Sequence, residues 1–323
     1  LGGAGAEHPT STDTATAATP TRLPLNAISS TTVHRDPTSL TDPVGLSTYS
    51  GPMLRCIMSL HRLACVGVVL TLIAGGGTVS ASAAPGVRIT EGSDQNLQSM
   101  LAAIDDAPSA DAGAQAEYIS RLFLGTPYGA HTLIGSATEP EQHVVELERV
   151  DCFTYADYVE ALKRSDNRDE FIANLVAVRY KNGDVSFENR KHFFTDWSAS
   201  APALATDITA SLSDNAVRTS KNLNSKDDGG VYLPGLPVVP RTVTYVPSEN
   251  VDDDVVSRLS TGDYLGAYAP DGGLDVTHVG MFIDAPDGPV FRHASSESGQ
   301  VIDTPLSAYL STINGIVVLR PVM

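Results

Sequence analysis

Cysteine occurs only three times in this sequence of 323 residues. Cys56 and Cys65 fall in a segment that we expect to be removed, which leaves Cys152 alone in the remaining chain. Exported proteins that use cysteine structurally carry it in pairs, so a disulfide within the remaining chain is excluded, and a dimer linked through Cys152 is the one exception. Cys152 is then either a small buried apolar side chain or a reactive thiol.

Basic residues are also few, with 21 Lys and Arg against 38 Asp and Glu, and the formal net charge is −17. Such a chain is repelled by the phosphates of nucleic acids and by anionic lipid headgroups. We therefore expect no nucleic-acid partner, and we expect partners that are neutral or of mixed charge.

Long hydrophobic runs are absent apart from residues 63–74, and this run is too short for a comfortable membrane span. His61 and Arg62 precede it, and residues 81–83 (ASA) form a small-residue cleavage pattern after it. We predict a secretory signal peptide over residues 53–83. The rest of the chain is then exported, periplasmic or secreted, with no stable membrane insertion after cleavage.

Residues 1–52 are rich in Thr, Ser, Ala and Pro and have no apolar period, so they cannot bury a core. We interpret them as a leader that is disordered or not native, because a signal peptide belongs at the true N-terminus. An uncleaved anchor and a lipid anchor at Cys65 are alternatives to the signal peptide. The sequence disfavours the lipid anchor because Arg62 stands where a lipoprotein signal has an aliphatic residue.

Helical patterns come first in the exported part, and short strand patterns follow. The apolar spacing predicts two helices within residues 94–124, further helices at 152–162, 168–178 and about 305–312, a hairpin around Asn182-Gly183, and a loop-rich stretch at 204–240. Strands are predicted in QHVVELERVD, RTVTYV, DYLGAYA, VTHVGMFI, PVFRHAS, GQVIDT and GIVVLR. This order indicates an α+β domain over residues 114–323, preceded by a helical lead-in at residues 84–113.

Cys152 stands at the predicted start of a helix, directly after Asp151, a residue that favours the N-cap position. A thiol attacks only as the thiolate, and a helix N-terminus favours the thiolate through its partial positive charge and free backbone N–H groups. These N–H groups can also stabilise the oxyanion of a tetrahedral intermediate. The carboxylate of Asp151 acts against the thiolate, although as an N-cap it is turned toward the backbone.

His278 is the best candidate for the base that a cysteine nucleophile requires. Strand alternation places His278 and Gly280 on one face, where small neighbours let another element approach. His293, near the end of the next predicted strand, is suited to orient His278, which completes a triad of Cys152, His278 and His293. The same three side chains are zinc-ligand types, but they lack the paired close spacing of a structural zinc site, so we predict no metal and no cofactor. A structural role for each histidine is the alternative.

With these residues in place, the chain resembles the N-acetylmuramoyl-L-alanine amidase-like proteins of the NlpC superfamily, bacterial cell-wall hydrolases with a papain-like fold. The resemblance runs in the family's order over residues 114–320, nearly the whole exported chain. It is carried by DCFTYADYVEAL, VRYKNGDVSFENRKHFFTDW, STGDYLGAYAPDGGLDVTHVGMFI, FRHASS, LSAYL and GIVVLR.

The resemblance implies that Cys152 is the nucleophile, His278 the base and His293 the orienting residue. It further implies a peptidoglycan-fragment substrate that is cut at the amide between N-acetylmuramic acid and L-alanine. Tyr128 then faces the nucleophile across the cleft, and NRKHFFTDW lines the cleft, which makes Arg190 and His192 candidates for binding peptide carboxylates. The alternatives are a γ-D-glutamyl-diamino acid endopeptidase on the same fold and a muropeptide-binding module without activity.

Overall fold

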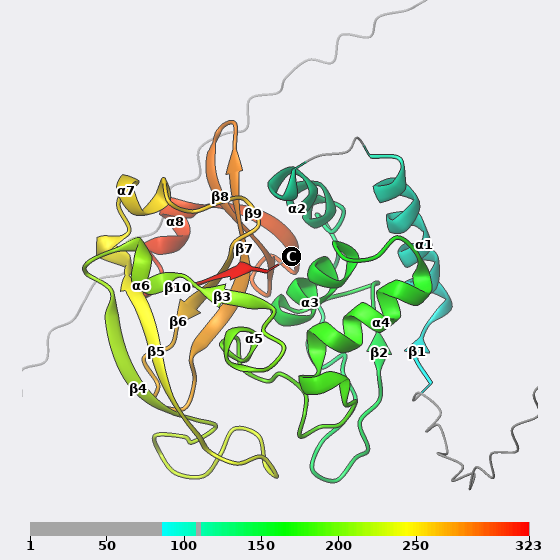
Figure 1. Ribbon diagram of the computed structural model, residues 1–323, viewed down its shortest axis with the longest axis horizontal. Helices are drawn as coiled ribbons and strands as arrows, with labels where there is room; N and C mark the ends of the chain where they lie inside the picture. Colours follow the sequence, from blue (N-terminus) through cyan, green and yellow to red (C-terminus); the bar gives the residue numbers. More distant parts are fainter. Residues whose placement is uncertain (1–85, 108–110, 323) are drawn as a thin grey trace, which may run out of the picture. The chain divides into compact units, whose positions relative to one another are not determined.

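The computed structural model describes residues 86–107 and 111–322 (Figure 1). The predicted leader and signal peptide lie outside these residues. In the described part, no helix is both long and apolar enough to span a membrane.

Four longer helices precede most of the strands, as predicted. They are α1 (Glu91–Asp105), α2 (Ala112–Arg121), α3 (Cys152–Leu162) and α4 (Arg168–Arg179). Each begins after a side-chain N-cap: the capping side chains of Thr90, Asp111, Asp151 and Asn167 accept backbone N–H groups of the first turn. The short helices are α5 (Asp196–Ala199), α6 (Thr209–Leu212), α7 (Asp253–Val256) and α8 (Leu306–Leu310).

The strands form one large sheet and one small pair. The large sheet has the order β4-β5-β10-β6-β7-β8-β9, and β3 pairs with the end of β10. Its strands are β3 (Ala205–Asp207), β4 (Val217–Leu223), β5 (Val239–Pro247), β6 (Tyr264–Tyr268), β7 (Val276–Ala285), β8 (Gly288–Ser295), β9 (Gln300–Pro305) and β10 (Gly315–Pro321). All its pairings are antiparallel, whereas β1 (Arg88–Ile89) and β2 (Val144–Val145) form a separate parallel pair. The predicted α+β class is confirmed.

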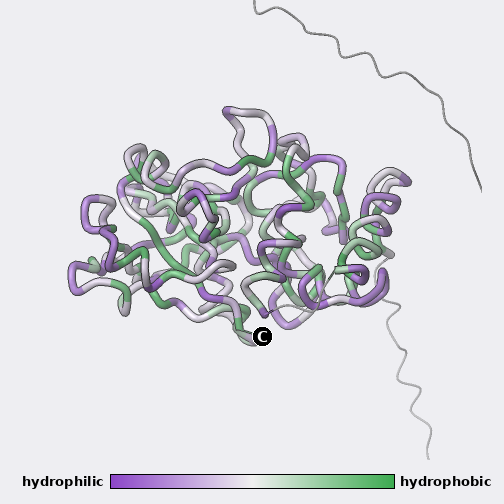
Figure 2. Tube along the Cα trace, turned by 90° about the horizontal axis from the view of Figure 1, so that it is seen from above, coloured by the Kyte–Doolittle hydropathy of each residue, from purple (hydrophilic) through white to green (hydrophobic). Residues whose placement is uncertain are grey.

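Each face of the large sheet is covered by different helices (Figure 1). Val279, Met281 and Ile283 on β7 pack in one core with side chains of α3 and α4. Phe282 alternates with them and packs in a second core with residues of α7 and α8. Figure 2 shows the apolar stretches gathered in the interior strands and helix faces, with hydrophilic loops outside. The large sheet is therefore the middle layer of the part of the chain that the structure describes.

Three local predictions were wrong or incomplete. The Asn182-Gly183 hairpin is absent: residues Lys181–Gly183 form a 3-10 turn after α4, in which Asn182 has φ of 54°. A positive φ at this dipeptide ends a helix as readily as it makes a hairpin. Only Val144–Val145 of QHVVELERVD form a strand. The stretch 204–240 contains β3, α6 and β4, and β4 was missed because most of its side chains are polar and exposed.

Candidate active site

Cys152 is the first residue of α3, and Asp151 fixes the start of that helix. Asp151 Oδ1 accepts hydrogen bonds from the backbone N–H groups of Phe153 and Thr154 at 3.1 and 2.7 Å. In return the backbone N–H of Asp151 donates to Thr154 Oγ1 at 3.0 Å. This capping box leaves Cys152 partly exposed at the tip of an otherwise buried helix.

The thiol of Cys152 is neutral in the free protein. Burial raises its pKa to about 11 and the Asp151 carboxylate adds to this effect, whereas backbone N–H groups of Val279, Cys152 and Phe153 lower the pKa. The helix N-terminus thus acts in the predicted direction, but burial and Asp151 outweigh it. The sequence could not show this burial, because it depends on which strand packs against the helix.

His278 and His293 are joined by a hydrogen bond between His278 Nε2 and His293 Nδ1 at 2.7 Å. The second nitrogen of His293, Nε2, lies 3.0 Å from Thr304 Oγ1. Burial lowers the pKa of both imidazoles to about 4. Both histidines are therefore neutral near pH 7, and a neutral imidazole can accept a proton from the thiol.

The start of α3 lies near the strand that carries His278, as three effects indicate. The N–H of Val279, the residue after His278, lowers the pKa of Cys152. The charge of Asp151 acts on the pKa of His278, against the larger effect of burial. Burial and then negative charge on Cys152 raise the pKa of Tyr309, whose ring centroid is 6.3 Å from that of His278. The structure thus places the start of α3 near the strand that carries His278, and the triad of Cys152, His278 and His293 stays a prediction.

An aromatic support holds the histidine pair from the side of α8. The ring of Phe291 stacks on Tyr309 at 4.2 Å and on His293 at 4.8 Å between centroids. Gly280 makes room for this support, because a Cβ there would lie 2.6 Å from the Phe291 ring. The Phe291 ring therefore explains why β7 has a glycine at position 280.

We expect Gly280→Ala to destabilise the fold by about 1–3 kcal/mol, as overpacking does, and to lower activity by displacing Phe291 from the histidines. Urea denaturation and a rate assay measure the two effects. Gly86→Ala is the matched control, since a Cβ at Gly86 meets no atom within 4 Å. Parent-like stability and activity of Gly280→Ala would contradict this steric reason.

Two cavities flank the candidate site. One of about 490 Å³ is lined by His278, His293, Tyr309 and the turn that holds Glu297. The other, also about 490 Å³, is lined by Asp151 and, among others, His131, Thr132, Leu133, Phe187, Arg190 and Leu233. One cavity thus borders the two histidines, and the other borders Asp151, the residue before Cys152.

The residues predicted to bind substrate have these positions. Tyr128 forms a β-bridge with Val150, just before the capped helix, and its pKa is raised by burial and by charge on Cys152 and Asp151. Arg190 lines a flanking cavity, but its guanidinium is ion-paired with Glu141 and is 13% exposed. His192 Nε2 is 2.7 Å from the carbonyl oxygen of Phe187. The carboxylate-binding role of Arg190 and His192 stays a prediction, and each already has an internal partner.

The rest of the NRKHFFTDW segment lies mostly in the core. Lys191 is buried and donates to the carbonyl oxygens of Ala177, Val178 and Tyr180. Asp196 is ion-paired with Arg241 at 2.8 Å. This segment joins α4 to the large sheet, so most of it serves the fold, whereas Arg190 lines a cavity.

Sequence reasoning missed two neighbours of the histidines, Thr304 and Tyr309. Both lie on elements whose position beside β8 depends on the order of strands. The sequence contained one signal for Tyr309: it lies in LSAYL, a segment that carried part of the family resemblance.

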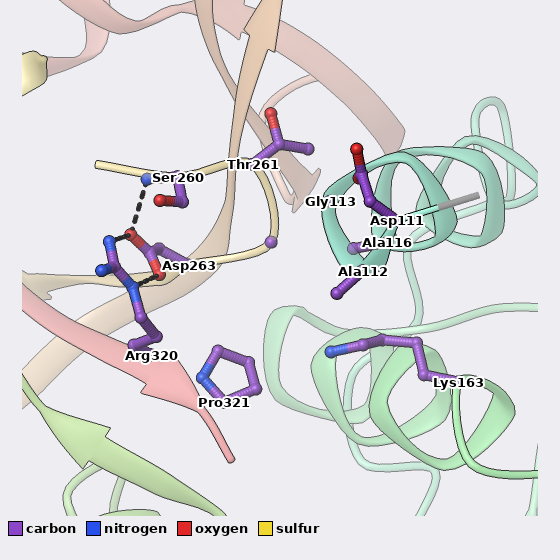
Figure 3. Close-up of a pocket in the computed structure, with 11 residues that line it drawn as sticks. Asp111, Ala112, Gly113, Ala116, Lys163, Ser260, Thr261, Asp263, Arg320 and Pro321 are labelled. Carbon is purple, nitrogen blue, oxygen red and sulfur yellow. Dashed lines mark hydrogen bonds and ion pairs between the residues drawn. The ribbon is translucent and has the colours of Figure 1, made fainter. Parts of the chain in front are cut away.

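A third cavity, of about 450 Å³, lies at the opposite end of α3 (Figure 3). Its two basic side chains are already paired: Arg320 with Asp263 at 2.7 Å, and Lys163 with Glu160 at 2.8 Å. Its other acidic side chain, Asp111, caps α2 and accepts a hydrogen bond from the backbone N–H of Ala114 at 2.8 Å. Within residues 86–107 and 111–322, no group of three or more His, Cys, Asp or Glu side chains is arranged to hold a metal ion.

Comparison with known proteins concerns the family and the fold. The family model AmiA-like, described as N-acetylmuramoyl-L-alanine amidase-like, matches residues 118–316. A crystal structure of an N-acetylmuramoyl-L-alanine amidase from Bacteroides uniformis is similar at 26% identity and a TM-score of 0.57, covering 66% of this chain and 100% of that chain. A protein from Legionella pneumophila shares the fold at 23% identity and a TM-score of 0.59, covering 71% of this chain and 95% of that chain. A search of curated proteins finds no match.

Proposed function

Because the chain belongs to the N-acetylmuramoyl-L-alanine amidase-like family, we propose that it is an exported cysteine hydrolase of peptidoglycan fragments on a papain-like, NlpC-type fold. It cuts the amide between N-acetylmuramic acid and L-alanine through Cys152, His278 and His293. The observation that carries this proposal is the 2.7 Å hydrogen bond between His278 and His293 on the paired strands β7 and β8.

The histidine pair defines the path of the proton. His278 Nε2 is engaged by His293, which leaves Nδ1 as the nitrogen available to the thiol. His278 takes the thiol proton as Cys152 Sγ attacks the carbonyl carbon of the lactyl group, and a tetrahedral oxyanion forms. Backbone N–H groups at the start of α3 stabilise this oxyanion. The intermediate collapses when the C–N bond breaks and His278 gives its proton to the leaving amine of L-alanine.

Water completes the cycle. It attacks the thioester carbonyl while His278 Nδ1 accepts its proton, and the proton then returns to the leaving sulfur. The products are the free lactyl carboxylate and a peptide that begins with L-alanine. These steps use only side chains and backbone groups of this chain, so the proposal includes no metal or organic cofactor.

The proton transfer of the first step occurs with substrate bound. In the free protein the thiol pKa is about 11 and the His278 pKa about 4, so both groups are neutral. The oxyanion site and the leaving amine then compensate the charges that appear during attack.

The pH dependence of kcat/KM follows from the raised pKa of Cys152 and the lowered pKa of His278. In the active form the Cys152 thiol holds its proton and the His278 imidazole is neutral. Lower pH protonates His278, and higher pH ionises Cys152. Burial disfavours both charged forms, so we expect the acid limb of kcat/KM below the ordinary histidine pKa of 6.5 and the alkaline limb above the ordinary thiol value of 9.0. A pH–rate profile tests this, and an acid limb at or above 6.5 would contradict it.

The nucleophile and its class are tested by inhibition. The full chain is incubated with defined muropeptides, with and without iodoacetamide or a metal chelator. Cysteine hydrolysis predicts loss of turnover after alkylation and none after chelation. A zinc hydrolase predicts the reverse, and a binding module predicts muropeptide binding without turnover in every tube.

A further inference from the structure

Thr304 lies behind the histidine pair, at the far end of a chain of hydrogen bonds. Its Oγ1 is 3.0 Å from His293 Nε2, and His293 Nδ1 is 2.7 Å from His278 Nε2. His293 is only 6% exposed, so water is a poor substitute for Thr304 as its partner. The two imidazoles and the Thr304 hydroxyl thus form a hydrogen-bonded chain that ends on β9.

The pairing of β8 with β9 makes the contact between Thr304 and His293 a fixed feature. Six residue pairs join these strands, with Thr304 opposite Phe291 and Ile302 opposite His293. One position along, Arg292 and Asp303 form two hydrogen bonds, Nε–Oδ1 at 2.7 Å and Nη2–Oδ2 at 2.9 Å. Such a two-point pair resists a slip of register, so Thr304 and His293 are held in reach of each other.

The direction of these hydrogen bonds decides whether His278 can act as a base. If His293 donates from Nε2 to Thr304, its Nδ1 is an acceptor, and His278 donates from Nε2. His278 Nδ1 then carries a lone pair and can take the thiol proton. If Thr304 donates instead, His293 donates from Nδ1, His278 carries its hydrogen on Nδ1, and no base faces the thiol.

We propose that Thr304 is a positioning residue: it accepts a hydrogen bond from His293 Nε2 and thereby keeps both histidines in the tautomers that make His278 Nδ1 basic. This inference rests on the proposed function. Thr304 also lines the cavity beside His278, so its own hydroxyl hydrogen can point into that cavity and leave the oxygen free to accept.

The test compares three variants of the full chain. Thr304→Val keeps the shape of the side chain and removes the acceptor, whereas Thr304→Ser keeps the hydroxyl. Thr242→Val is the matched control, because Thr242 is an exposed strand residue on β5 opposite Ser220. Two quantities are measured: the ¹⁵N chemical shifts of the histidine ring nitrogens, and kcat and KM on a muropeptide. The His293 signals are assigned by their loss in His293→Gln.

We expect Thr304→Val to lower kcat about tenfold with KM within about twofold, the size expected when a hydrogen bond that orients a catalytic group is lost. The shifts should show that the hydrogen on the His293 ring is no longer confined to Nε2. Thr304→Ser and Thr242→Val should keep the kcat and KM of the parent and its histidine nitrogen shifts.

The results separate this inference from the proposed function. Parent turnover with an unchanged His293 tautomer in Thr304→Val would overturn the role of Thr304 and leave the proposed hydrolysis intact. A parent with no turnover on any muropeptide would overturn the proposed function, while the nitrogen shifts would still report the role of Thr304. A parent spectrum with the hydrogen of His293 on Nδ1 would overturn the inference outright.

Discussion

We expect Cys152→Ala to abolish the proposed hydrolysis of muropeptides and to leave the fold intact. Removal of the nucleophile from a triad costs about 10⁴-fold or more in kcat, because the remaining groups cannot form the covalent intermediate. The side chain is partly exposed and forms no disulfide, so we expect the free energy of unfolding to change by less than about 1 kcal/mol. Single-turnover assays and urea denaturation measure the two quantities.

Cys152→Ser is the matched control for shape, since it keeps a hydrogen-bonding atom of similar size at the start of α3. It should bind muropeptide like the parent and turn it over about as poorly as the alanine variant, because the hydroxyl is a much weaker acid than the thiol. Hydrolysis at the parent rate in either variant would exclude Cys152 as the nucleophile.

We expect Arg179→Met to destabilise the protein by about 3–5 kcal/mol, because it leaves the Asp157 carboxylate buried without its partner. Arg179 is 1% exposed, and its Nε donates to Asp157 Oδ2 at 2.9 Å. Burial raises the pKa of Asp157 while the charge and hydrogen bond of Arg179 lower it, so loss of Arg179 removes the two largest effects that oppose burial. The midpoint of urea denaturation should fall accordingly.

The double variant Arg179→Met with Asp157→Leu is the control for this effect. It removes the carboxylate as well, and a buried ion pair exchanged for apolar side chains is often close to neutral in stability. We expect it to recover most of the loss of the single variant. Equal loss in both would show that Arg179 acts through its hydrogen bond to the carbonyl oxygen of Val144 and not through Asp157.

Local patterns were sufficient to predict the elements that carry the candidate site. Asp151 followed by an apolar repeat predicted the start of α3, and the capping box confirms that start. Alternation in VTHVGMFI and PVFRHAS predicted β7 and β8. The structure confirms both strands and pairs them, so His278 and His293 lie on neighbouring strands. These signals are readable because caps and strand periods depend on residues close in sequence.

What depends on distant pairing could not be predicted. β4 was missed because it is mostly polar and is a strand only through its pairing with β5 along seven residues. Thr304 and Tyr309 are distinguished from other threonines and tyrosines only by the register of β9 and the position of α8. The neutral state of Cys152 likewise depends on burial, which a helix pattern does not show.

The bond that is cut tests the account most directly. The full chain and its Cys152→Ala variant are incubated with a defined muropeptide, and the products are identified by mass spectrometry. With the parent we expect free peptide beginning with L-alanine and a free N-acetylmuramic acid carboxylate, and with the variant we expect intact substrate. Cleavage after D-glutamate, or the same products from the variant, would contradict it.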